Sequence, residues 1–279
     1  MGGAGGDRSG PPRPGGHPLR PGATMTARTA HLPIWVDLAT PDPAAAADFY
    51  GPLFGWTSQP GARSPGYLVF RKDGRAVAGA GALAAHGEPA AWSTYVGTED
   101  IDATVRRAEA AGAKLLAAPE PVAGEGSAAA LADPAGAPFA LWQPAGMAGA
   151  ELFNAPGALC WNELATRDAA GSAEFYGAVF DWVAVAQPMG AGSYTTFRRR
   201  GEERPVAGMI EMAGEQWPAE LPAHWLPYFA VLDTDAAAQQ VEALGGMVCV
   251  PPTDIPEQGR FAVLADPAGG TFCVITAAG

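Results

Sequence analysis

Apolar and polar side chains alternate along residues 34–40, and the alternation ends at Pro41. Because successive side chains of a strand point to opposite faces, this pattern predicts a β-strand. Apolar residues then recur at helical spacing, at Ala45, Phe49 and Leu53, with Ala46, Tyr50 and Phe54 beside them. Asp42 can cap this helix at its start, and Gly55 can end it. The segment is therefore predicted to be a strand followed by a helix.

Further elements follow as far as residue 142. The sequence predicts strands at 67–71, 75–82 and 93–97, a helix at 101–111, and strands near Leu115, at 128–131 and at 139–142. Gly112 is the residue at which the second helix is expected to stop. Together these elements make two successive βαβββ units.

The same pattern occurs again in the second half of the chain. Residues 34–56, IWVDLATPDPAAAADFYGPLFGW, match residues 160–182, CWNELATRDAAGSAEFYGAVFDW, at a constant offset of 126 residues. The run LADPAG at 131–136 recurs at 264–269, at an offset of 133 residues, so the second copy has a longer middle segment. A period of about 130 residues is too long for a solenoid repeat and indicates a duplicated domain.

These features divide the chain into four parts. Residues 1–30 are rich in Gly and Pro and are expected to be disordered, since they offer little apolar surface to offset chain entropy. They lack the apolar core of a secretory signal, and Met25 offers an alternative start. Residues 31–143 form the first predicted domain, 144–158 the linker and 159–279 the second domain.

Composition and charge narrow the classes of function. Of the 279 residues, 48% are hydrophobic and 16% are charged, which is enough apolar surface for two compact cores. The net charge of −12 argues against nucleic-acid binding, which needs a basic face. No uninterrupted apolar stretch reaches the roughly 18 residues that suggest a membrane span. The cysteines, Cys160, Cys249 and Cys273, fall in predicted strands, which indicates reduced thiols and a cytoplasmic location.

The repeated motifs resemble those of the vicinal oxygen chelate superfamily, which contains glyoxalases, bleomycin-resistance proteins and extradiol dioxygenases. The motif D-x-x-x-A-x-x-F-Y-x-x-x-F-G-W spans residues 42–56 and recurs in close form at 168–182, where Asp181 replaces the glycine. A D-P-x-G-x-x-F element closes each domain, at 133–139 and at 266–272. The resemblance covers nearly all of the chain after residue 30.

This resemblance implies an α+β fold with two tandem glyoxalase-like domains. Four βαβββ units would form half-open curved mixed sheets, with helices on the outer face, and each domain would enclose a cavity. Catalytic members of the superfamily hold a divalent metal with a His on the first strand, a His or Gln on the fifth and a Glu on the last.

In this chain the residues at those three positions do not provide a set of metal ligands. The corresponding residues are Trp35, Ser93 and Ala140 in the first domain and Trp161, Leu226 and Cys273 in the second. A divalent cation needs several carboxylate or imidazole donors, so we expect no metal and no other cofactor. His224, two residues before Leu226, is expected to lie at the rim of the cavity rather than to bind a metal.

Strand alternation indicates what lines the two cavities instead. If Val36 and Leu38 pack against the helix, Trp35 and Asp37 face the cavity. The candidate ligand-binding residues are then Trp35, Asp37, Tyr95 and Trp142 in the first domain and Trp161, Glu163, His224 and Tyr228 in the second. The tryptophans either stack on a ligand or plug the cavity. Asp37 and Glu163 are either catalytic bases with raised pKa values or carboxylates hydrogen-bonded within the sheet.

Three functions remain open from the sequence. The leading hypothesis is a metal-free protein that binds a small organic molecule, for sequestration or as an accessory to small-molecule metabolism. The second is an enzyme, either a glyoxalase-like lyase or isomerase or an oxygenase of the hydroxylase type, with Asp37 or Glu163 as the base. The third is a non-catalytic scaffold with both cavities plugged, since one fold can host unrelated functions. The expected partner is a small-molecule ligand, and self-association as a homodimer is left open.

Overall fold

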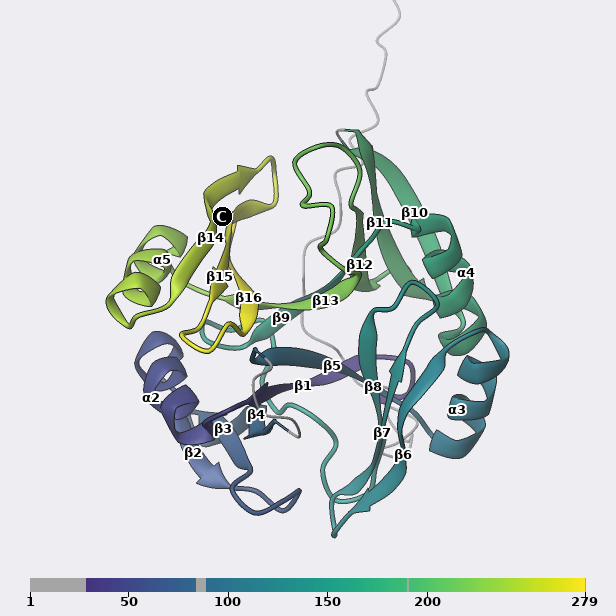
Figure 1. The fold of residues 1–279 in the computed structure, drawn as a ribbon, viewed down its shortest axis with the longest axis horizontal. Helices are drawn as coiled ribbons and strands as arrows, with labels where there is room; N and C mark the ends of the chain where they lie inside the picture. The colour runs from purple at the N-terminus through teal and green to yellow at the C-terminus, as the bar shows by residue number, and fades with distance from the viewer. Residues whose placement is uncertain (1–28, 84–88, 190, 279) are drawn as a thin grey trace, which may run out of the picture.

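The computed structural model describes three stretches of the chain, residues 29–83, 89–189 and 191–278 (Figure 1). Residues 1–28 of the tail predicted to be disordered lie outside these stretches, whereas Ala30 forms a β-bridge to the first domain. Within the described residues, the chain forms two sheets of eight strands, one from each copy of the repeat.

The first sheet has the strand order β2-β3-β4-β1-β5-β8-β7-β6. Its strands are β1 (Pro33–Thr40), β2 (Thr57–Pro60), β3 (Leu68–Lys72), β4 (Arg75–Ala82), β5 (Ala91–Gly97), β6 (Lys114–Val122), β7 (Gly126–Ala132) and β8 (Pro138–Pro144). Helix α2 (Pro43–Phe54) follows β1, and helix α3 (Ile101–Ala110) follows β5.

The second sheet repeats this order as β10-β11-β12-β9-β13-β16-β15-β14. Its strands are β9 (Leu159–Thr166), β10 (Trp182–Met189), β11 (Gly192–Arg199), β12 (Pro205–Glu211), β13 (His224–Ala230), β14 (Met247–Ile255), β15 (Gly259–Ala265) and β16 (Thr271–Ala277). Helix α4 (Ala169–Phe180) follows β9, and helix α5 (Thr234–Ala243) follows β13.

Each sheet joins two βαβββ units at the first strand of each unit. Strand β1 pairs in parallel with β4 and antiparallel with β5, while β5 pairs in parallel with β8. In the second sheet β9 pairs in the same way with β12 and β13, and β13 pairs in parallel with β16. The predicted α+β fold, with tandem domains and curved mixed sheets that do not close into a barrel, is thereby confirmed.

The ends of α2 form as its sequence predicts. The carboxylate of Asp42 accepts hydrogen bonds from the backbone N–H groups of Ala44 and Ala45. Gly55 ends the helix in the left-handed conformation, with φ of 67°. The corresponding residue of α4, Asp181, takes the same conformation with φ of 56°. Asp is among the few residues other than Gly that tolerate this backbone, so the departure from the motif leaves the helix end unchanged.

The sequence analysis did not delimit β2 and β10, the strands at one edge of each sheet. All four residues of β2 are exposed, and so are most residues of β10. Neither strand therefore buries one face, and the alternation that predicts a strand is missing. Backbone pairing with β3 and β11 holds them in the sheets.

Among the described residues, the two large apolar cores are each built by side chains of both domains, and a small third cluster contains Leu226, Tyr228 and Cys273. In the α2/α5 core, the ring of Phe54 lies 4.9 Å from Phe229 and 5.9 Å from Phe272, both on the second sheet. In the α3/α4 core, Phe139 of β8 lies 5.9 Å from Tyr176 of α4. Figure 1 shows α2 beside α5 on one side of the molecule and α3 beside α4 on the other.

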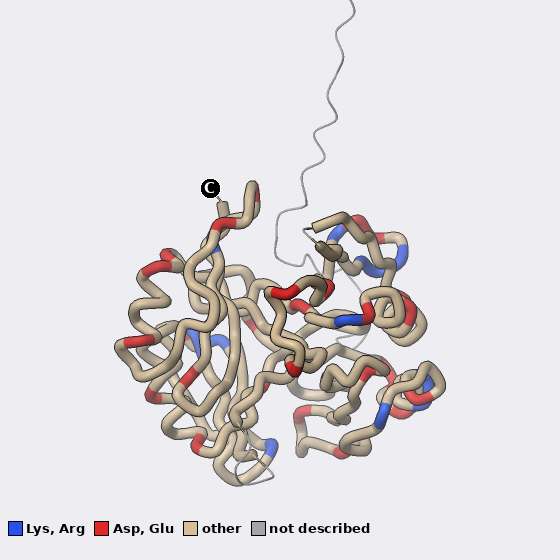
Figure 2. Tube along the Cα trace, turned by 45° about the horizontal axis from the view of Figure 1, so that its top comes forward, with Lys and Arg blue, Asp and Glu red and all other residues tan. Residues whose placement is uncertain are grey.

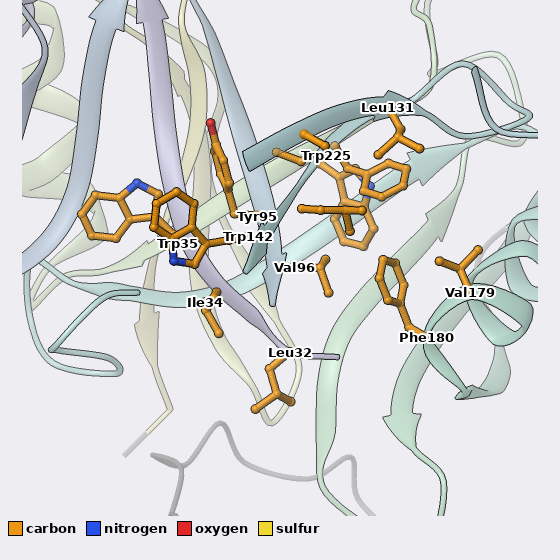
Figure 3. Packing of buried hydrophobic residues seen from close by; sticks show 14 of the residues in the cluster. Leu32, Ile34, Trp35, Tyr95, Val96, Leu131, Trp142, Val179, Phe180 and Trp225 are labelled. Atoms are coloured by element: carbon orange, nitrogen blue, oxygen red, sulfur yellow. The ribbon is translucent and has the colours of Figure 1, made fainter. Parts of the chain in front are cut away.

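Figure 3 shows the α3/α4 core from close by, where side chains from the two domains meet. Leu131 and Val96 of the first domain belong to the same buried cluster as Val179, Phe180 and Trp225 of the second. Helices α2 and α4 therefore bury their apolar faces against side chains of both sheets. Separation of the domains would expose these apolar faces to water.

The two sheets pack back to back, with β5 against β13, and their concave faces open in opposite directions (Figure 1). At the centre, the hydroxyl of Thr94 donates a buried hydrogen bond of 2.9 Å to the side-chain oxygen of Asn162. Acidic and basic residues are spread over the outside of the molecule (Figure 2). No helix in the described stretches is long and apolar enough to cross a bilayer.

Candidate functional site

Aromatic side chains close the concave face of the first sheet. Trp35 of β1, Tyr95 of β5 and Trp142 of β8 line a cavity of about 10 Å³. Their exposed fractions are 2%, 4% and 3%, and Figure 3 shows them gathered on one side of the sheet. A cavity needs roughly 10–15 Å³ to hold one water molecule. This cavity thus has room for a single water and none for an organic ligand.

Strand register explains why these residues meet. Trp35 lies directly opposite Tyr95, and Tyr95 is paired with Ala140 on β8. Val36 and Leu38 point to the other face of β1 and are buried in the α2/α5 core. The alternation predicted for β1 is therefore the one observed.

Arg63 covers this face from the loop between β2 and β3. Its guanidinium forms an ion pair with Asp37 and donates a hydrogen bond to the hydroxyl of Tyr95. The carbon at its centre lies 5.2 Å from the ring of Tyr95 and 5.9 Å from that of Tyr67, within the range of cation–π attraction. The Arg63 side chain is 34% exposed and that of Asp37 only 10%.

Burial raises the pKa of Asp37, because removal from water disfavours the charged carboxylate. The positive charge of Arg63 opposes this effect, and hydrogen bonds from Tyr95 and Tyr67 oppose it further. Asp37 therefore has a charged partner within the protein.

The second concave face carries the same kinds of side chain, and no Lys or Arg of the described residues forms an ion pair with its carboxylate. Trp161 of β9 is partly exposed, and its indole N–H donates a hydrogen bond of 3.0 Å to the hydroxyl of Tyr194. The hydroxyl of Tyr228 donates to Glu163 Oε1 at 2.8 Å. Tyr194 also hydrogen-bonds Glu163, which is 7% exposed. Two tyrosines thus hold one buried carboxylate beside an accessible indole.

Burial raises the pKa of Glu163 above its ordinary value, and the hydrogen bonds from Tyr228 and Tyr194 oppose the rise. In the part of the chain that the structure describes, no Lys or Arg contributes to this pKa or forms an ion pair with Glu163. The second carboxylate therefore differs from Asp37 in having no protein cation beside it.

A glycine beside each carboxylate makes room for these contacts. Gly79 pairs with Asp37 across β4 and β1, and Gly208 pairs with Glu163 across β12 and β9. A Cβ atom at Gly208 would collide with the hydroxyl of Tyr194, and one at Gly79 would collide with the corresponding tyrosine of the first domain. Any larger residue at either position would displace the tyrosine.

The residues at the metal positions of the superfamily do not fit a divalent cation. Trp35 and Trp161 stand on the first strands, Ser93 and Leu226 on the fifth, and Ala140 and Cys273 on the last. Indole, methyl and isobutyl groups donate no electron pair to a metal, and a single thiol or hydroxyl makes no site. Among the described residues, no three His, Cys, Asp or Glu side chains come together as a metal-binding group.

The remaining predicted residue, His224, is the first residue of β13 and is paired with Ala165. It stands two residues from Leu226, whose strand partner is Glu163, and it is partly exposed. Its Nδ1 lies 2.8 Å from the carbonyl oxygen of Pro222, and burial lowers its pKa. His224 thus lies at the beginning of its strand.

The sequence analysis did not identify three residues of the two concave faces as candidates: Arg63, Tyr67 and Tyr194. The tyrosines stand three residues before Phe70 and Phe197 in the two copies, so a closer comparison of the repeats identifies them as a pair. Arg63 lies in a loop, where side-chain direction follows no period.

The two back-to-back sheets of paired βαβββ units have the fold of solved two-domain glyoxalases and extradiol dioxygenases. A family model described as a glyoxalase-like domain matches residues 34–142 and 160–275. The chain belongs to this glyoxalase-like family, with two tandem domains.

Two curated relatives are similar over nearly the whole chain. The anthracycline biosynthesis protein DnrV of Streptomyces peucetius is 39% identical over 90% of this chain and 95% of its own length. The protein named "Putative glyoxylase CFP32" of Mycobacterium tuberculosis is 37% identical over 87% of this chain and 94% of its own. The Mn(II)-bound glyoxalase of Novosphingobium aromaticivorans has the same fold, with a TM-score of 0.61, 16% identity, and coverage of 88% of this chain and 82% of its own.

Proposed function

We propose that this protein binds a small organic molecule on the concave face of its second domain, without a divalent metal. One observation carries the proposal: Trp161 is partly exposed beside the buried carboxylate of Glu163, whereas the corresponding Trp35 is enclosed. An accessible aromatic surface with a few fixed polar groups is typical of small-molecule sites.

The first domain has a different role in this proposal. Trp35 plugs its concave face, Arg63 covers it, and the remaining cavity of about 10 Å³ is too small for a ligand. The first domain then supports the second through the two shared cores.

Sequestration or an accessory step in small-molecule metabolism is the role that fits these features. The name of DnrV, an anthracycline biosynthesis protein, supports a place in the metabolism of aromatic compounds. The free thiols of Cys160, Cys249 and Cys273 support a reducing, cytoplasmic compartment.

A ligand titration tests the proposal. Planar aromatic compounds, both neutral and charged, should quench tryptophan emission saturably and raise the melting temperature of the full chain. Trp161→Ala should remove most of both effects, and Trp35→Ala, the matched change in the first domain, should leave the affinity unchanged. An absence of any saturable effect across the compounds would leave a non-catalytic scaffold as the better account.

The raised pKa of Glu163 favours catalysis as a second candidate function. A buried carboxylate with a raised pKa can act as a general base near neutral pH. The enzyme would then be a lyase, an isomerase or an oxygenase of the glyoxalase/dioxygenase superfamily. Conversion of a bound ligand, followed by mass spectrometry, should be lost in Glu163→Gln while binding of the ligand remains.

A further inference from the structure

The two concave faces correspond residue by residue, except for one cation. The matched pairs are Trp35 and Trp161, Asp37 and Glu163, Tyr67 and Tyr194, Gly79 and Gly208, and Tyr95 and Tyr228. In both domains the carboxylate lies beside two tyrosines and near an indole that hydrogen-bonds one of them. Since the two faces use the same groups, a chemical group bound on one face indicates which kind of group the other face can bind.

In the first domain the occupant is the side chain of Arg63. Its guanidinium is held by the carboxylate of Asp37, by the hydroxyl of Tyr95 and by the faces of two tyrosine rings. A carboxylate combined with aromatic faces is the arrangement that proteins use for organic cations. Because Arg63 reaches this position from a loop, it occupies the face in the manner of a ligand.

Among the residues that the structure describes, no arginine of the second domain pairs with Glu163 as Arg63 pairs with Asp37. In the first domain the β2 and β3 strands separate after the Pro60–Leu68 pair, and the loop between them carries Arg63. In the second domain β10 and β11 stay paired as far as Met189 and Gly192, so the long loop is missing. The segment from 183 to 197 contains no Lys, Arg or His.

Glu163 is consequently a buried carboxylate whose neighbours are tyrosines and not cations. A buried carboxylate without a positive partner is costly, and an added cation supplies the missing charge. Trp161, two residues before Glu163 and on the same face of β9, is partly exposed to solvent. The missing partner can therefore come from outside the protein.

We infer that the concave face of the second domain binds the cationic group of a small organic molecule, a planar guanidinium or amidinium, in the position that Arg63 occupies in the first domain. This inference rests on the proposed function and names the chemical class of its ligand. The carboxylate of Glu163 pairs with the cation, and the rings of Tyr194 and Tyr228 face it. The rest of the ligand lies against Trp161.

The test compares benzamidine, a planar aromatic amidinium, with benzamide, its neutral analogue of nearly the same shape. Calorimetric titration of the full chain should give about one site for benzamidine and an affinity for benzamide lower by about tenfold or more. Glu163→Gln, which keeps an acceptor for Tyr228, should lower the benzamidine affinity by about tenfold or more and bring it close to that for benzamide.

Arg63→Ala provides a second, independent arm. Removal of the built-in cation should open the first face and add a second benzamidine site, which Asp37→Asn should remove again. Thermal unfolding of each variant shows whether it remains folded. If Arg63→Ala unfolds, the Glu163→Gln comparison in the otherwise unchanged chain still decides the inference.

Two results would overturn the inference. One is equal affinity for benzamide and benzamidine, and the other is benzamidine binding that Glu163→Gln leaves unchanged. If neutral planar aromatics bind in a Trp161-dependent way while benzamidine does not, the inference fails and the proposed function stands. If no compound of either kind binds, both fail.

Discussion

The hydroxyl of Tyr50 donates a buried hydrogen bond of 2.9 Å to Asp266 Oδ2, although the two residues belong to different domains and stand 216 positions apart. The second copy repeats the relationship, because Tyr176 donates to Asp133 Oδ2 at 3.0 Å. The tyrosine belongs to the F-Y motif that starts each domain, and the aspartate to the LADPAG run that closes the other. In both cases the tyrosine of one domain thus hydrogen-bonds the aspartate of the other domain.

Tyr50→Phe should lower the free energy of unfolding by about 2–4 kcal/mol, since it leaves two buried polar groups without a partner. One is Oδ2 of Asp266, and the other is the indole N–H of Trp92, which donates to the Tyr50 hydroxyl at 3.1 Å. Urea denaturation measures the loss. Tyr176→Phe, the matched change, should cost a similar amount because Trp225 and Asp133 make the same contacts. A loss below about 0.5 kcal/mol, typical of surface positions, would contradict this account.

The protein should unfold in a single cooperative transition. Both apolar cores contain residues of both domains, so one domain cannot unfold without exposing the core of the other. Calorimetry and the circular dichroism of the aromatic side chains should give coincident melting curves. Two resolved transitions, one for each domain, would show that the domains are stable independently.

The contribution of Glu163 to stability should fall as pH rises. Its pKa is raised above the ordinary value of 4.5, so the folded protein binds this proton more tightly than the unfolded chain does. The resulting stabilisation is complete below pH 4.5 and is lost as pH rises through the folded-state pKa.

Glu163→Gln removes this titration. Its free energy of unfolding relative to the wild type should therefore increase from pH 5 to pH 8, because only the wild type loses the stabilisation from this proton as pH rises. Denaturation of both proteins at the two pH values measures the change, and titration of all other groups cancels in the difference. A difference that stays constant with pH would mean that the carboxylate is not desolvated as described.

The two matched tryptophans should respond differently to truncation. Trp35→Ala should destabilise the protein by about 3–5 kcal/mol, because it leaves a cavity among enclosed side chains. Trp161→Ala should destabilise less and instead weaken ligand binding by about 1–3 kcal/mol. Thermal unfolding and fluorescence titration of the two variants separate these effects. Equal destabilisation without an effect on binding would identify Trp161 as a second plug.

The purified protein should contain well below one equivalent of zinc, iron, manganese or nickel per chain when measured by elemental mass spectrometry. Chelator should leave its melting temperature unchanged, because no metal-binding energy is linked to folding. A stoichiometric metal whose removal lowers the melting temperature would contradict the assignment of the ligand positions to Trp35, Ser93 and Ala140 and to their counterparts.

The sequence predicts most of the fold because each strand and helix carries a local signal. Alternation along β1 placed Trp35 and Asp37 on one face, and the Asp42 cap and Gly55 marked the helix that follows. The duplication then extended these assignments to the second domain.

The contacts between residues of different domains could not be predicted from these local signals. The repeat identifies Tyr50 and Asp266 as parts of motifs, but a single sequence holds no information on which copies pair. Arg63 was missed for another reason: its position depends on how a loop folds back over the sheet, and loops have no period.

The shared cores also have a consequence for how such a protein can evolve. In a symmetric homodimer, every substitution appears in both sites at once. Here the two halves are covalently joined and their concave faces open in opposite directions, between the two helix pairs (Figure 1). Substitutions can then differ between the two faces, so that Arg63 pairs with Asp37 on one face while Glu163 on the other has no cationic partner among the described residues. A single chain of this kind can therefore keep one face for binding and use the other half as its structural support.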